Sequence, residues 1–246
     1  MVEVIIYLLA ITAAQVVSVF SVPVWGILCQ TVVLTVIIVR STLADRHLNQ
    51  RVLLPLVLVP LLRIISLAMP LTDIPPIMLY YLSCVLVCVA AVGVVRILGY
   101  TSAQVGINLR QAPTQLIVAF TGITFGIAEY FILIPEPMIV ELTLQEIWLP
   151  ALILLVSAGF MVEFVFRGVL QNGITEVFGG WGIVYVSLLF TVTYIGFLPL
   201  IDLILIFVVA LLFGYVVRKT GSIVGVALSR GIWNIVLYLI VPFLLG

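Results

Sequence analysis

The segment Val162-Glu-Phe-Val-Phe-Arg-Gly168 places a carboxylate and a guanidinium inside a long apolar stretch of the chain. Glu163 and Arg167 are four residues apart, a spacing that brings two side chains together on a helix and allows an ion pair. Charged groups are costly inside a membrane, where they usually face the interior of a helical bundle in pairs. The segment therefore predicts a membrane-embedded helix whose polar groups point at neighbouring helices.

The composition of the whole chain predicts a polytopic membrane protein. Of its 246 residues, 65% are hydrophobic and only 8% are charged, and the mean hydropathy of +1.43 lies far outside the usual range of soluble domains. A membrane crossing needs about 20 mostly apolar residues, and runs near this length recur from end to end. The formal net charge of zero gives no support for nucleic acid as a partner.

Prolines, charges and polar clusters divide the chain into nine predicted crossings. We expect them at about 3–21, 24–40, 51–69, 76–98, 114–133, 148–171, 181–197, 200–217 and 222–244. The first pair requires a tight turn at Ser21 and Pro23, because one helix over residues 3–40 would be too long for a single span. A shallow or re-entrant segment is the alternative there. The predicted fold class is an all-α, polytopic integral membrane helical bundle of about eight to nine transmembrane helices, a single membrane domain over residues 1–246.

The charged residues between these crossings predict an orientation. Positive residues gather on one side, at Arg40, Arg46, Arg51, Arg96, Arg110, Arg218 and Lys219. Acidic residues gather on the other, at Asp73, Glu136, Glu141 and Glu146. Since cytoplasmic loops carry the excess of Lys and Arg, we expect a multi-pass protein of the cell (plasma or inner) membrane with a cytoplasmic N-terminus and an external C-terminus.

Smaller features give further expectations. Residues 99–113 are expected to form a short helix in the cytoplasmic interface, and 134–147 an external loop. Cys84 and Cys88 are interpreted as packing residues on one helix face. The tryptophans are mostly near predicted helix ends, as interfacial anchors would be, at Trp25, Trp148, Trp181 and Trp233.

Three motifs after residue 150 resemble the CPBP family, which comprises the CAAX prenyl-proteases and the bacteriocin-processing, Abi-type membrane proteins, with an intramembrane metalloprotease-like fold. Val162 to Gly168 resembles the first motif, Glu-Glu-x-x-Phe-Arg-Gly. Phe190 to Tyr194 resembles the second, Phe-x-x-x-His, and Arg230-Gly-Ile-Trp-Asn234 resembles the third, His-x-x-x-Asn. The resemblance implies a CPBP-like core over 114–244, in the C-terminal half, after variable N-terminal helices over 1–110.

The chain departs from the chemistry that this resemblance implies. In the family a glutamate polarises a water, while histidines and an asparagine hold the site and stabilise the oxyanion. The degenerate motif positions here are Val162, Glu163, Arg167, Tyr194, Arg230 and Asn234. A hydrocarbon side chain accepts no proton, and a carboxylate held by a guanidinium is a poorer base. We expect no catalytic residues at these positions, and no metal, because the one histidine of the chain, His47, lies in a charged loop.

Charged residues buried in the predicted spans need an explanation other than catalysis. The candidates are Arg63, Glu129, Glu163 and Arg230. We expect Arg230 to fill the former histidine space and pair with Glu163. The alternative is an anion or polar-headgroup site formed by Arg230, Asn234 and Tyr194.

Glu129 has two interpretations. The first is a hydrogen-bonded packing residue between helices, because Gly122 and Gly126 allow close approach there. The second is a protonatable carboxyl in a translocation path. Arg63 is its candidate partner.

The predicted function is that of a non-catalytic CPBP-like membrane protein, a pseudoprotease that acts as an interaction or assembly subunit of a membrane protein complex. The expected partners are other membrane protein subunits and lipids. No cofactor is predicted, apart from a bound lipid or hydrophobic cofactor at a partner interface. The alternatives are a CAAX-type intramembrane protease rewired to use Glu163 or Glu129, a bacteriocin self-immunity protein, and a transporter or lipid-handling protein.

Overall fold

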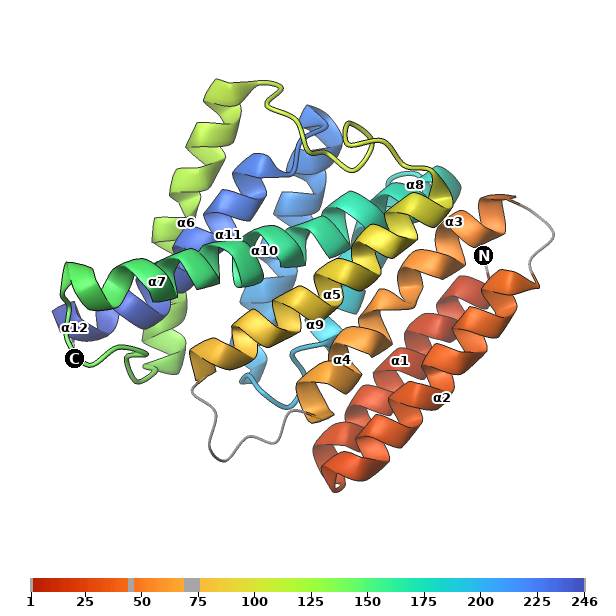
Figure 1. Ribbon diagram of the computed structural model, residues 1–246, viewed down its shortest axis with the longest axis horizontal. Coiled ribbons are helices and arrows are strands. Elements are labelled where there is room, and N and C mark those ends of the chain that lie inside the picture. The colour runs from red at the N-terminus through yellow and green to blue at the C-terminus, as the bar shows by residue number, and fades with distance from the viewer. Residues whose placement is uncertain (1, 44–46, 69–75, 246) are drawn as a thin grey trace.

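The computed structural model describes residues 2–43, 47–68 and 76–245, which form helices joined by turns (Figure 1). In chain order the helices are α1 (Val2–Phe20), α2 (Pro23–Thr42), α3 (His47–Leu56), α4 (Leu58–Ala68), α5 (Pro76–Leu98), α6 (Ala112–Leu133), α7 (Leu144–Leu154), η1 (Leu155–Met161), η2 (Phe164–Leu170), α8 (Gln171–Phe178), α9 (Trp181–Val192), α10 (Leu200–Thr220), α11 (Val224–Ile235), η3 (Val236–Ile240) and α12 (Val241–Leu245). The η segments are π-helical, so their hydrogen bonds reach one residue further along the chain than in an α-helix. Among the described residues no strand is present, and the predicted all-α class is confirmed.

Eight helical segments of the described residues are long and apolar enough to cross a membrane, which confirms the predicted polytopic bundle. The crossing predicted at 181–197 is the exception, because α9 ends at Val192 after 12 residues. At about 1.5 Å per residue a helix of this length spans only about 18 Å, less than a bilayer core. The chain turns after it through Gly196, whose φ of 90° lies in the left-handed region that glycine tolerates.

The N-terminal helices confirm the predicted tight turn. Helix α1 ends at Phe20 and α2 begins at Pro23, and the Ser21 hydroxyl donates a hydrogen bond to the Val17 carbonyl at 2.6 Å. The two helices lie side by side as a hairpin (Figure 1). Further on, the helix is interrupted at Val57, between α3 and α4. Pro60 has no backbone N–H to donate to Leu56 across this break, and Pro55 lies just before it.

The interfacial helix predicted at 99–113 is wrong. Residues 100–111 form turns, in which Gly106 has a left-handed φ of 76°. The Gly106 carbonyl accepts a hydrogen bond from the Ile223 backbone N–H at 2.9 Å, and the Asn108 side-chain amide donates to the Gly221 carbonyl at 2.7 Å. Long-range bonds to the turn before α11 therefore hold this segment in addition to the local bonds of its turns.

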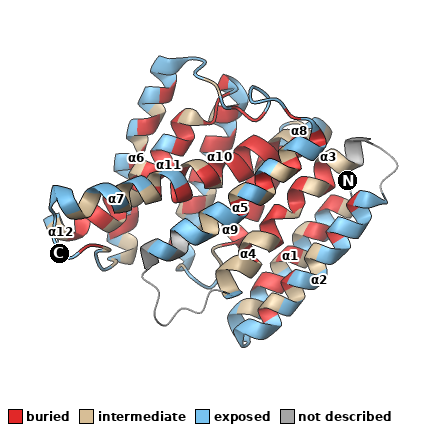
Figure 2. Cartoon of the chain, viewed as in Figure 1, coloured by how far each residue is buried: buried red, intermediate tan, exposed pale blue. Residues whose placement is uncertain are grey.

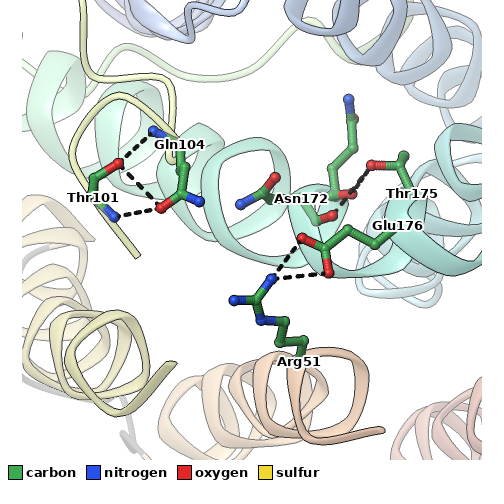
Figure 3. A network of polar contacts seen from close by, with 7 residues as sticks. Arg51, Thr101, Gln104, Asn172, Thr175 and Glu176 are labelled. Atoms are coloured by element: carbon green, nitrogen blue, oxygen red, sulfur yellow. Dashed lines mark hydrogen bonds and ion pairs between the residues drawn. The ribbon is translucent and has the colours of Figure 1, made fainter. Parts of the chain in front are cut away.

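The basic ends of the helices meet at one end of the bundle. Arg51 of α3 pairs with Glu176 of α8 at 3.1 Å (Figure 3). Burial beside this pair, with Glu176 nearby, raises the pKa of Tyr100 to about 12. Arg46 and Asp73 lie outside the described residues, as does the side chain of His47. Which membrane face this end occupies stays a prediction.

Helix α11 lies at the centre of the packing, between α6 and the helix that runs from Leu144 to Phe178 (Figures 1 and 2). Trp233 of α11 is buried at 2% exposure, so it is a core residue and not the interfacial anchor predicted for it. The side chains of the other three tryptophans are exposed, in keeping with that prediction: Trp25, Trp148 and Trp181. Cys84 and Cys88 are free thiols, both on α5.

Candidate functional site

The motif residues lie in the middle of a continuous helical segment, Leu144–Phe178, which is 35 residues long. The π-helical segments η1 and η2 flank Val162 and Glu163 on either side. Because successive residues of a helix point about 100° apart, the two side chains face different neighbours. Val162 lines a cavity inside the bundle, whereas Glu163 does not and is 1% exposed.

Glu163 is held by Arg167. The Glu163 Oε2 and Arg167 Nε atoms are 3.3 Å apart and both side chains are fully buried, which confirms the ion pair that the four-residue spacing allows. Arg167 also lines a small cavity of about 150 Å³, together with Gln171 and Asn172. Its buried Nη1 and Nη2 atoms find no hydrogen-bond acceptor among the described residues.

Arg230 does not pair with Glu163, and that prediction is wrong. Among the described residues Glu163 pairs with Arg167, and no ion pair involves Arg230. The Arg230 Nη2 atom instead donates a hydrogen bond to the Tyr194 hydroxyl at 2.9 Å. Its guanidinium carbon lies 4.6 Å from the centre of the Phe190 ring and 5.0 Å from that of Trp233. Aromatic faces attract a cation, so rings take the place that the prediction assigned to a carboxylate.

Asn234, one turn further along the same helix, uses its amide locally. Its Nδ2 atom donates to the Arg230 carbonyl at 2.8 Å. Arg230, Asn234 and Tyr194 all line one cavity, as the alternative prediction requires.

Glu129 is buried between α6 and α11, where it accepts a hydrogen bond from the Trp233 indole N–H. Asp202 of α10 lies nearby, and its buried carboxyl oxygens have no hydrogen-bond partner among the described residues. The helices approach closely because Gly122 and Gly126 present no side chain to α11. This geometry agrees with Glu129 as a hydrogen-bonded packing residue.

Arg63 does not pair with Glu129. Its Nε atom donates to Gln15 Oε1 of α1 at 2.7 Å, and its guanidinium carbon lies 4.8 Å from the centre of the Phe197 ring. Its Nη2 atom is buried without a hydrogen-bond partner among the described residues. Arg63 is itself only 4% exposed, so it is a buried cation without a described counter-ion.

A cavity of about 490 Å³, the intramembrane cavity, brings most of these residues together. Its wall combines α4 and α5 with α6, the Leu144–Phe178 helix, the turn after α9, and α11. The charged side chains on this wall are Arg63, Glu129 and Arg230. Of the degenerate motif positions, those on this wall are Val162, Tyr194, Arg230 and Asn234, while Glu163 and Arg167 lie outside it.

The residues that the structure describes do not fit a metal ion. Within the described residues no group of three or more His, Cys, Asp and Glu side chains is placed to hold one. At the cavity wall, the position that would hold the family's water-activating carboxylate carries the Val162 side chain.

The comparison of this chain with known families agrees with the motifs. Residues 144–236 match the family model described as Type II CAAX prenyl endopeptidase Rce1-like. This part of the chain is an Rce1-like domain. The CPBP resemblance drawn from the three motifs is therefore confirmed. No curated protein and no solved structure matches the chain.

The intramembrane cavity lies where α4 and α5, which precede the Rce1-like domain, pack against that domain. Arg63, Ser83 and Cys84 belong to α4 and α5, yet they share this cavity with the domain's motif positions. Arg63 was predicted as a buried charge, but its place beside Tyr194 was not. Because an arginine inside a membrane costs free energy, an arginine in an N-terminal span was the sequence signal that pointed to Arg63 as a site residue. The helix that it faces depends on tertiary packing.

Proposed function

We propose that the protein is a non-catalytic Rce1-like membrane protein, a pseudoprotease that serves as an interaction or assembly subunit of a membrane protein complex. The observation that carries this proposal is the separation of Val162 and Glu163. The cavity wall has a hydrocarbon where the family has its first glutamate, and the remaining carboxylate is fully buried against Arg167 outside the cavity. A general base must reach the water that it activates, and Glu163 does not reach the cavity.

The other changed positions support loss of the protease reaction. A neutral imidazole accepts or donates a proton near neutral pH, whereas arginine stays charged and tyrosine stays protonated. Arg230 and Tyr194 bond to each other, which joins α11 to the turn after α9. Asn234 bonds to its own helix.

The surface supports an interaction role inside the membrane. The exposed side chains of α1, α2 and α5 are largely apolar, and the polar segments between helices are short. A partner would therefore be recognised mainly through apolar helix faces, by packing and by small residues, as membrane helices associate. We place the protein in the cell membrane, with its N-terminus cytoplasmic, and lipids or a hydrophobic cofactor would fill gaps at the partner interface.

The first test is isolation of the native complex. We expect the protein, purified from its own membrane in mild detergent, to bring down one or more membrane proteins in fixed proportion. Mass spectrometry would identify these subunits, and an absorption spectrum would report any pigment. An unrelated polytopic protein with the same tag is the control. Recovery of the chain alone, from several mild detergents, would contradict the assembly role.

The second test is proteolysis. We expect no cleavage of a prenylated CAAX peptide by the wild-type protein in proteoliposomes, under conditions in which an active type II CAAX endopeptidase cleaves it. The assay detects the cleaved peptide by mass spectrometry, and Glu163→Gln should likewise give no cleaved peptide.

A rewired protease is the competing function, and one observation favours it: Glu129 and Asn234 lie on the same cavity wall. Cleavage by the wild type that disappears in Glu129→Gln, but persists in Glu176→Gln at the bundle end, would establish this reading and overturn the pseudoprotease.

A further inference from the structure

The intramembrane cavity carries an excess of positive charge at its wall. Arg63 enters it from α4 and Arg230 from α11. Neither arginine takes part in an ion pair with a described carboxylate. Glu129, the one carboxylate on the described wall, accepts the hydrogen bond of the Trp233 indole and forms no ion pair with a described arginine.

Tyr194 contacts one arginine and shares the cavity wall with the other. Its hydroxyl accepts the hydrogen bond from Arg230, and it lines the same cavity as Arg63. The aromatic rings of Phe190 and Phe197 cover the two guanidinium groups, at 4.6 and 4.8 Å. The rings orient both planar groups but neutralise neither of them.

Arg63 donates from Nε to Gln15 but has no counter-ion among the described residues. It is more than nine-tenths buried, it lines the cavity, and its Nη2 atom has no acceptor among the described residues. A buried donor without a partner costs free energy, and a buried charge costs more. A ligand that brings an anionic oxygen to Arg63 would remove both costs, because guanidinium groups bind carboxylate and phosphate through paired hydrogen bonds.

The rest of the wall is mostly apolar, with a few hydroxyl groups such as those of Ser66, Ser157 and Thr193. The aliphatic and methionine side chains on it include Leu62, Val87, Met161, Val165 and Leu198. Its volume of about 490 Å³ lies in the range of small-molecule sites. A site that combines two cations with a mostly hydrocarbon wall matches an amphiphile with an anionic head and a hydrocarbon chain.

We propose that the intramembrane cavity binds an anionic amphiphile, a lipid with a carboxylate or phosphate head, whose head group lies between Arg63 and Arg230 and whose chain lies along the apolar wall. Arg63 supplies the free donors, and Arg230, held by Tyr194, supplies the second positive charge. Binding by these two arginines is independent of whether the protein assembles with partner subunits.

Trp233 provides a reporter, because it lines the same cavity beside Arg230. A variant that retains only this indole, with Trp25→Phe, Trp148→Phe and Trp181→Phe, is purified in the non-ionic detergent dodecyl maltoside. It is titrated with ω-bromoundecanoate, whose terminal bromine quenches indole fluorescence on contact, and with its methyl ester, which has the same chain and no charge. We expect saturable quenching by the acid and a weak, non-saturating effect of the ester.

Arg63→Gln in the same background should weaken the apparent affinity for the acid about tenfold or more, as expected when a charged hydrogen-bond donor is lost. Arg63→Lys keeps the charge and should retain part of the affinity. Arg110→Gln, the same substitution at an exposed position, is the matched control and should change nothing. The elution volume on size exclusion shows whether each variant is folded.

Two results would overturn the proposal. Saturable quenching that survives Arg63→Gln, or equal quenching by acid and ester, would show that the arginines do not select the head group. Displacement of the acid by inorganic phosphate at equal concentration would assign the site to a free anion instead of an amphiphile.

Discussion

Glu163→Gln is expected to destabilise the protein by about 3–5 kcal/mol, the cost typical of removing one partner from a buried ion pair. Both side chains of the Glu163–Arg167 pair are fully buried. The substitution preserves shape but leaves the Arg167 charge without its carboxylate inside the bundle. Reversible unfolding in mixed micelles, with increasing mole fraction of a denaturing detergent, measures the change in free energy of unfolding.

The matched control is Glu176→Gln, which removes the partner of Arg51 in a pair whose side chains are about one third exposed, at 33% and 32%. Exposed pairs contribute about 0–1 kcal/mol, so a small effect is expected there. The double variant Glu163→Gln with Arg167→Met should be less destabilised than Glu163→Gln alone, because no unpaired charge remains. An equal, small loss in Glu163→Gln and Glu176→Gln would show that the buried pair does not stabilise the fold.

Gly122→Ala is expected to have the second largest effect, a loss of about 2–3 kcal/mol from overpacking. A Cβ atom at Gly122 would lie 2.1 Å from the Ser229 carbonyl oxygen of α11, a backbone atom that no rotamer change can move. The helices α6 and α11 would have to separate, and the hydrogen bond between Glu129 and Trp233 bridges this same interface. The measurement is the same unfolding assay, with Trp233 fluorescence as a second readout.

Gly93→Ala is its matched control, since Gly93 is also in a membrane-spanning helix but has no atom within 4 Å of the added methyl group. Alanine is the better helix former, so this variant should be as stable as the wild type or slightly more stable. If both glycine variants lose the same stability, the loss comes from helix propensity or from membrane insertion of the helix. Close packing of α6 on α11 would then not explain it.

Composition was enough to predict much of the fold. Hydrophobic runs of spanning length arise from the chain itself, and eight of the nine predicted crossings correspond to apolar helices of sufficient length. The prediction failed at the one crossing where packing, and not the apolar run, sets the length of the helix. The apolar run at 181–197 continues past Val192, but Gly196 turns the chain so that α10 can pack beside α9. The failed interfacial helix at 99–113 has the same cause, because its backbone bonds to the turn before α11.

The motifs predicted the Rce1-like domain and the residues to examine within it. The spacing of four residues on one helix also allowed the Glu163–Arg167 pair that the structure shows. The same reasoning failed for Arg230. Its partner had to come from another helix, and the structure places Tyr194, Phe190 and Trp233 there.

By itself, the sequence determined that this protein is a helical membrane bundle, that its C-terminal half contains an Rce1-like domain, and that Val162 replaces a carboxylate. These properties depend on residue type and on spacing within one element. Only the tertiary structure decided that Arg63 of α4 lies in one cavity with Arg230 of α11, and that Glu163 lies outside it. Contacts between helices depend on how the helices rotate and cross, which close packing at residues such as Gly122 determines for the bundle as a whole.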